Sequence, residues 1–128
     1  MPDTPARAGF HTITPYIMVR EAEALIEFVK QTFGATETMR AIGSAGGIHA
    51  EVRIGESMLM IGGARGGDPM PAALYLYLAD VDAVYQRALS AGATTLAEPE
   101  DHDDGDRRAG VRDAFGNQWY IATHTAAQ

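Results

Sequence analysis

The pattern of apolar and polar positions predicts one amphipathic helix in each half of the chain. In residues 21–33, apolar side chains recur at three- and four-residue spacing, and Gly34 follows as a stop signal. Residues 81–91 are predicted as a second helix, which ends before Gly92. Two helices of similar length therefore divide the chain into two comparable halves.

Strands are predicted around these helices, from short runs that are rich in β-branched or aromatic residues or that alternate apolar with polar positions. In the first half we expect strands at residues 12–20, 36–42, 48–54 and 57–61. In the second half we expect them at residues 73–78, 94–97, 109–112 and 118–123. Between the halves runs GGARGGDPMP, whose four glycines and two prolines are typical of a linker.

The element order is therefore the same in both halves. The first helix ends in Gly-Ala-Thr at residues 34–36, and the second ends in the same three residues at 92–94. This repetition predicts an α+β fold of two tandem βαβββ modules. We expect a single domain, with module one at about residues 12–62, a linker at 63–71 and module two at about 72–124.

Composition narrows the range of functions. The chain has 128 residues, no cysteine and a net charge of -7, so thiolate catalysis is excluded and nucleic acid is an improbable partner. No apolar run is long enough to span a membrane, and the N-terminus lacks the pattern of a secretion signal, which favours a cytoplasmic protein. Part of the negative charge lies in residues 98–106, which we interpret as a solvated loop.

Alternation along residues 48–54 directs His49, Glu51 and Arg53 to one face of their strand. His49 and Glu51 could form a metal pair or an acid–base dyad, and His124 is a candidate third ligand. In the alternative interpretation the three residues form a polar lattice or a dimer contact. The second interpretation is favoured, because a zinc site needs at least three protein ligands.

Tyrosines provide the clearest indication of a ligand site. Tyr75, Tyr77 and Tyr120 are expected on the concave face of the second module, and Tyr16 is a further candidate. Their rings could stack on a planar ligand, although strands also favour tyrosine without any ligand. Arg107 and Arg112 could anchor a ligand carboxylate or phosphate, but ion pairing with the acidic run is the favoured use.

Several segments together resemble a known family. They are TPYIMVREAEALIEFVKQTFGA, HAEVRIGESMLMIGGA, GDRRAGVRDAFGNQW and YIATH, within residues 12–124. They are similar to the vicinal-oxygen-chelate superfamily, specifically to the PhnB-like branch of its glyoxalase and bleomycin-resistance relatives. The resemblance implies curled mixed sheets around a cavity that holds a metal or a small molecule, commonly within a homodimer.

The resemblance also implies where metal ligands would stand. Metal-using members supply a ligand from the first and last strands of each module, usually His or Glu. These positions fall near Thr14 and Ala73 on the first strands, and near Met60 (or Leu59) and Tyr120 on the last strands. None is a usual ligand of a divalent metal, so we expect no metal cofactor.

The sequence therefore predicts a metal-independent protein that binds a small molecule, possibly planar and aromatic or antibiotic-like. The alternative is a lyase- or dioxygenase-like enzyme that uses His49 and Glu51, with or without a divalent metal. The expected ligand-binding residues share a position on the concave strand faces; they are Tyr16, His49, Glu51, Arg53, Tyr75, Tyr77 and Tyr120.

Overall fold

A computed structural model describes residues 5–43, 46–63 and 68–125 of the chain. The described residues divide into two compact units, one within residues 1–30 and 34–70 and one within residues 31–33 and 71–128, and each is described by itself. The α+β fold of two tandem βαβββ modules is confirmed: each unit holds a four-stranded mixed sheet and one helix, in the predicted order. No helix in the described ranges is long and apolar enough to cross a membrane.

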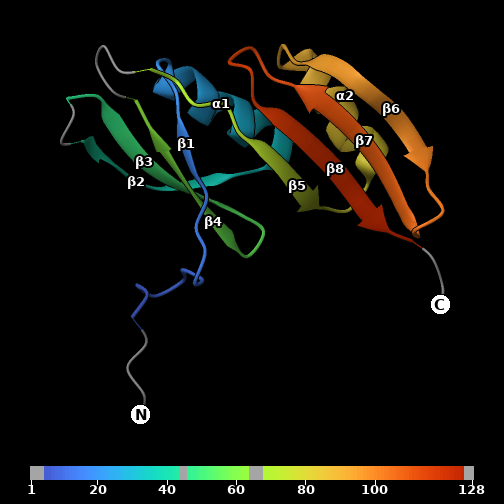
Figure 1. Ribbon diagram of the computed structural model, residues 1–128, viewed down its shortest axis with the longest axis horizontal. Coiled ribbons are helices and arrows are strands. Elements are labelled where there is room, and N and C mark those ends of the chain that lie inside the picture. The colour runs from blue at the N-terminus through green and yellow to red at the C-terminus, as the bar shows by residue number, and fades with distance from the viewer. Residues whose placement is uncertain (1–4, 44–45, 64–67, 126–128) are drawn as a thin grey trace. The chain divides into compact units, whose positions relative to one another are not determined.

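The first unit contains strands β1 (Tyr16–Met18), β2 (Thr36–Ile42), β3 (Ile48–Ile54) and β4 (Ser57–Gly62). Helix α1 (Ala22–Phe33), which belongs to this unit up to Lys30, lies on one face of the sheet (Figure 1). The strand order is β1-β4-β3-β2, and only β1 and β4 are parallel. Helix α1 ends at Gly34, whose backbone is left-handed with φ of 68°.

The core of this unit follows the predicted periodicities. Leu25, Ile26 and Val29 form the apolar stripe of α1 and are fully buried. Ala50 and Val52 alternate along β3 and are fully buried too. The residues between them on β3 therefore face away from the helix.

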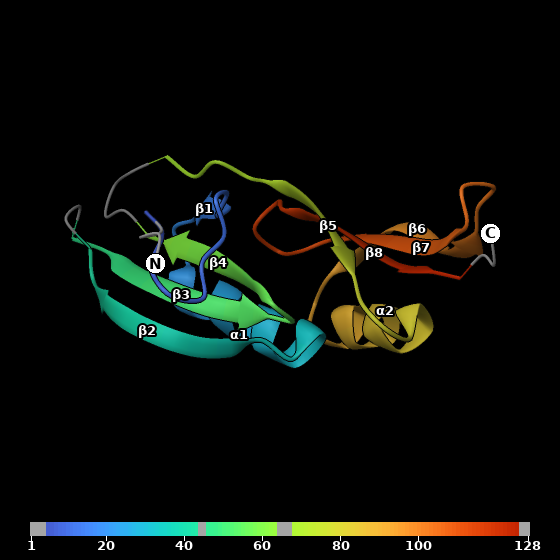
Figure 2. The ribbon, with the colours of Figure 1, turned by 90° about the horizontal axis from the view of Figure 1, so that it is seen from below.

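The second unit contains β5 (Ala73–Tyr77), α2 (Val81–Ser90), β6 (Thr94–Asp101), β7 (Asp106–Arg112) and β8 (Gln118–His124). Its strand order is β5-β8-β7-β6, and α2 covers one face of this sheet, as the edge-on view in Figure 2 shows. The Asp80 carboxylate caps α2 by accepting a hydrogen bond from the backbone N–H of Ala83. Trp119, Ile121 and Val111 are fully buried.

Element boundaries differ from the predictions by more than one residue at three strands. The first strand is limited to Tyr16–Met18, although residues 12–20 were expected. Strand β6 extends to Asp101 and β7 begins at Asp106, so the interpretation of residues 98–106 as a loop was wrong for most of that run. Because β6 is an edge strand, its polar side chains and Pro99 can face solvent without breaking a central ladder.

The predicted linker is described only in part, since residues 64–67 lie outside the described ranges. In the part that is described, the Met70 backbone N–H donates a hydrogen bond to the Met18 carbonyl at 2.9 Å. This end of the linker therefore extends the hydrogen bonding of the edge strand β1.

A buried carboxylate holds the turn between β7 and β8. Asp113 is 4 % exposed and accepts hydrogen bonds from the backbone N–H groups of Phe115 and Asn117, each at 2.9 Å. It also accepts from the Asn117 side-chain amide at 2.9 Å and the Trp119 indole N–H at 2.8 Å. Asn117 in turn accepts from the Ala72 backbone N–H, next to β5. The DAFGNQW segment is therefore a structural turn that fixes the hairpin behind the site described next.

Candidate functional site

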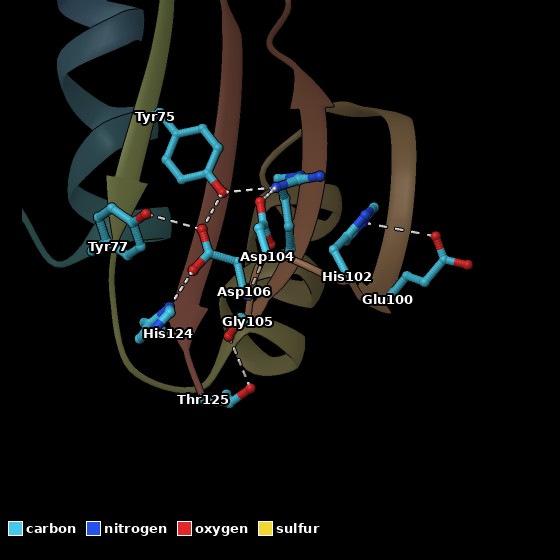
Figure 3. A network of polar contacts seen from close by, with 10 residues as sticks. Tyr75, Tyr77, Glu100, His102, Asp104, Gly105, Asp106, His124 and Thr125 are labelled. Carbon is cyan, nitrogen blue, oxygen red and sulfur yellow. Dashed lines mark hydrogen bonds and ion pairs between the residues drawn. The ribbon is translucent and has the colours of Figure 1, made fainter. Parts of the chain in front are cut away.

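A polar network lies on the face of the second sheet that points away from α2 (Figure 3). The Tyr75 and Tyr77 hydroxyls both donate to Oδ2 of Asp106, at 2.6 and 2.9 Å. His124 Nδ1 lies 2.9 Å from Oδ1 of the same carboxylate. We call this surface the tyrosine face. Its members share one side of β5, β7 and β8; they are Tyr75, Tyr77, Asp106, Arg108, Tyr120 and His124.

The network favours one charge state of Asp106, Tyr75 and Tyr77. Asp106 is 4 % exposed, and the hydrogen bond from Tyr75, followed by that from His124, lowers the pKa of its carboxyl to about 2. Burial and the Asp106 carboxylate raise the pKa of Tyr75, and the Asp106 carboxylate raises that of Tyr77. At neutral pH, Asp106 is therefore an anion and both tyrosines are neutral donors. Since an ionised carboxylate only accepts, His124 Nδ1 carries a proton.

Tyrosine rings make a continuous aromatic surface around this anion. The Tyr75 ring centroid lies 5.4 Å from that of Tyr77 and 6.4 Å from that of Tyr120, the second pair nearly parallel at 22°. Tyr75 and Tyr77 are 44 % and 64 % exposed. The Tyr120 ring lies across Gly110, where an added Cβ would be 3.0 Å from ring carbons. Glycine at this position therefore lets the ring lie close to the sheet.

The two arginines at the start of β7 point to opposite sides. Arg108 Nη1 donates to the Tyr75 hydroxyl at 3.0 Å and to Asp104 at 3.3 Å, and its guanidinium lies 5.8 Å from the Tyr75 ring centroid. Arg107 instead pairs with Asp82 of α2 and with Asp101. The structure therefore shows Arg107 in ion pairs, which is the use favoured from the sequence. The cation on the tyrosine face is Arg108.

Sequence reasoning missed Asp106 and Arg108. Asp106 was assigned to the acidic loop and Arg108 was not considered, because the strand was predicted to begin only at Ala109. Extending the alternation of β7 backward by three residues would have placed both on the same face as Gly110. His124, a candidate third ligand beside His49, contacts Asp106 instead.

The first sheet carries a smaller polar group on its face away from α1. The Tyr16 hydroxyl lies 3.2 Å from His49 Nδ1, and His49 Nε2 lies 3.5 Å from Oε2 of Glu51. The Glu51 side chain is 4 % exposed and forms an ion pair with Arg7. Arg53 is exposed and makes no ion pair within the described part of the chain. The structure thus gathers Tyr16, His49 and Glu51 on one sheet and Tyr75, Tyr77 and Tyr120 on the other.

The positions that the resemblance assigns to metal ligands do not fit a divalent metal. Met60 lies opposite Tyr16, Tyr120 lies opposite Tyr75, and Ala73 lies opposite Gln118. A thioether and a phenol are poor ligands for the metals that this arrangement would hold, and the Ala73 methyl group has no donor atom. Across the described ranges, no group of three His, Asp or Glu side chains could hold a metal ion.

Comparison with protein families gives a match over most of the chain. The model of the Glyoxalase/Bleomycin resistance protein/Dioxygenase superfamily matches residues 9–121. An uncharacterised protein of Mycobacterium bovis is 36% identical over 122 residues, which cover 85% of this chain and 80% of that protein. An uncharacterised protein of Mycobacterium tuberculosis is also 36% identical, over 72% of its length.

Solved structures with the same architecture share less sequence. TioX from Micromonospora sp. ML1 superposes with a TM-score of 0.73 at 23% identity, covering 89% of this chain and 98% of TioX. A glyoxalase I variant from Zea mays gives 0.74 at 15% identity, covering 88% of this chain and 44% of the maize protein. At these identities the likeness shows the fold alone.

Proposed function

Because the chain belongs to the Glyoxalase/Bleomycin resistance protein/Dioxygenase superfamily, whose shared fold leaves the activity open, we propose that it binds a small planar aromatic molecule on the tyrosine face without a metal. An antibiotic-like ligand is one member of this class. The PhnB-like branch and a homodimer, both expected from the sequence, are part of the same proposal.

The observation that best supports this proposal is that exposed tyrosine rings are held in place by hydrogen bonds within their own sheet. Tyr75 and Tyr77 both donate to Asp106, which is nearly fully buried. Their rings therefore lose little conformational freedom when a ligand stacks on them, which favours affinity.

Arg108 supports a ligand that carries an anionic substituent. Both of its hydrogen bonds within the described residues use Nη1, which leaves Nη2 and Nε as donors beside the Tyr75 ring. A planar ligand on Tyr75 could direct a carboxylate or phosphate to this guanidinium.

Acid–base catalysis is the second candidate function, and the pairing of Asp106 with His124 is the observation that favours it. A carboxylate that binds Nδ1–H orients an imidazole so that Nε2 can act as a general base. This pair is closer than His49 and Glu51, at 2.9 Å against 3.5 Å. The enzyme proposal therefore moves from the first sheet to the second, and it needs no metal.

The test is a binding screen of planar aromatic carboxylates against the full chain, followed by calorimetry with variants. Tyr75→Ala and Tyr77→Ala should each weaken binding about fivefold, because each removes a stacking ring worth about 1 kcal/mol. Tyr16→Ala, which removes a half-exposed tyrosine from the first sheet, is the matched control and should bind normally. Adding a metal chelator should leave the affinity of the wild-type protein unchanged.

Normal binding by both second-sheet variants, combined with lower thermal stability, would contradict the proposal. Mass spectrometry of the compound recovered from the same samples distinguishes binding from catalysis. Chemical conversion by the wild-type protein that is lost in His124→Gln, with binding retained, would favour the enzyme.

A further inference from the structure

Glu51 is a buried carboxylate whose own sheet gives it little support. It lies in the middle of β3, opposite Met39 of β2 and Met60 of β4, and its side chain is 4 % exposed. On the same strand, His49 offers a polar side chain, and its Nε2 lies 3.5 Å from Oε2 of Glu51. Burying a carboxylate among methionines is costly unless a cation or several donors face it.

The cation comes from outside the sheet. Arg7 precedes β1 by nine residues, in a segment without helix or strand, and its guanidinium binds Oε2 of Glu51. The same guanidinium lies 4.4 Å from the centroid of the Phe10 ring, and the Phe10 N–H closes a turn by donating to the Arg7 carbonyl. A short turn therefore delivers one cation to the carboxylate.

This cation is placed so that it can be exchanged. The Arg7 side chain is 61 % exposed although its partner is buried, and an exposed arginine pays little to return to water. If it withdrew, a buried carboxylate, His49 and the half-exposed Tyr16 would remain on the sheet. Those groups accept hydrogen bonds and suit a planar cation.

We propose that the carboxylate of Glu51, with His49 and Tyr16, is a binding site for a guanidinium or amidinium group of another molecule, which Arg7 occupies when that molecule is absent. The tethered guanidinium shows the chemistry that the site accepts. A free ligand must displace Arg7, so its apparent affinity is reduced by the fraction of protein in which Arg7 is bound. The site shares no residue with the tyrosine face and does not depend on the function proposed there.

The test is titration of the full chain with butylguanidinium, followed by NMR, with butylurea as an uncharged probe of the same shape. Arg7→Ala should bind butylguanidinium about tenfold more tightly than the wild-type protein. Adding Glu51→Gln to that variant should remove the gain, and butylurea should bind neither protein. Arg53→Ala is the matched control, because it removes one exposed cation from the strand that carries Glu51.

Equal gains in Arg7→Ala and Arg53→Ala would overturn the proposal, since general charge would then explain both. Failure of Arg7→Ala to bind the probe would overturn it as well, and would leave a purely structural ion pair. If Arg7→Ala does not fold, the wild-type protein decides: the Arg7 Nε–H resonance should shift as butylguanidinium is added, and an unchanged resonance at saturation would refute displacement.

Discussion

The two sheets carry similar polar groups but satisfy them differently. Each has one nearly buried carboxylate on the face away from its helix, accompanied by histidine and tyrosine. In the second sheet, Asp106 takes its donors from residues of β5 and β8. In the first sheet, Glu51 depends on Arg7, which belongs to no strand or helix.

This difference separates a fixed surface from an exchangeable one. Donors that belong to the sheet hold Asp106 and the tyrosine rings in one arrangement, which suits stacking on a rigid ligand. A donor on an irregular segment can leave without disturbing any strand pairing. Two sheets of the same strand order thus hold their buried carboxylates in two different ways.

The largest expected effect concerns the hairpin that supports the tyrosine face. Asp113→Ala removes the acceptor of four hydrogen bonds, three of them from buried donors, and should lower the free energy of unfolding by about 4 kcal/mol. Urea denaturation measures it. Glu56→Ala, in the exposed turn between β3 and β4, is the matched change in the first sheet and should have almost no effect.

Equal losses in the two variants would break the comparison, because the second sheet would then be no more rigidly held than the first. If Asp113→Ala is too unstable to purify, Asp113→Asn keeps part of the acceptor set. The free energy of unfolding of Asp113→Asn should lie between those of Asp113→Ala and the wild-type protein.

A smaller effect is expected from pH, and it is specific to Asp106. The folded pKa of about 2 lies below the ordinary value of 3.8, so the ionised form stabilises the fold. This contribution is fully present above the ordinary value and is lost as the pH falls toward 2. The excess stability of the wild-type protein over Asp106→Asn should therefore shrink between about pH 5 and pH 2 in urea denaturation.

Asp103→Asn controls for the loss of one negative charge, because Asp103 is exposed in the turn between β6 and β7. This variant should follow the wild-type curve throughout. A pH-independent gap between Asp106→Asn and the wild-type protein would show that the Asp106 hydrogen bonds do not depend on its charge.

Alternation predicted much of the tyrosine face but could not complete it. The period of two placed Tyr75, Tyr77 and Tyr120 together, because each is flanked by apolar residues along its strand. Asp106 was missed since an acidic run with glycine and proline has the composition of a loop, and only pairing with β8 makes it a strand. Strand pairing depends on residues that are distant in the sequence.

The Arg7–Glu51 contact was beyond prediction for a related reason. It joins positions 44 residues apart, and Arg7 lies in a segment without periodicity. The DAFGNQW segment was noticed for its resemblance alone, whereas the structure assigns it a physical role through Asp113. Local pattern thus predicted which residues share a face, but not which partners reach them from elsewhere.

The smallest expected effect comes from the two glycines under tyrosine rings. A Cβ at Gly62 would lie 2.3 Å from the Tyr16 hydroxyl oxygen, and one at Gly110 would lie 3.0 Å from the Tyr120 ring. Because the Tyr16 side chain is half-exposed, its ring can rotate away from the added methyl group. This rotation would break the contact between the Tyr16 hydroxyl and His49. Since alanine also reduces the entropy of the unfolded chain by about 0.4–1 kcal/mol, Gly62→Ala should be nearly neutral.

Gly110→Ala should cost more, about 1 kcal/mol, because the Tyr120 ring is less free to move. Its hydroxyl donates to Gln118 at 2.8 Å, its ring stacks near Tyr75, and Leu96 lies 3.5 Å from the added Cβ. Urea denaturation of the two variants side by side tests this order. If Gly62→Ala were the more damaging change, Tyr16 would be held as firmly as Tyr120, and the first sheet would not be the looser surface that an exchangeable Arg7 requires.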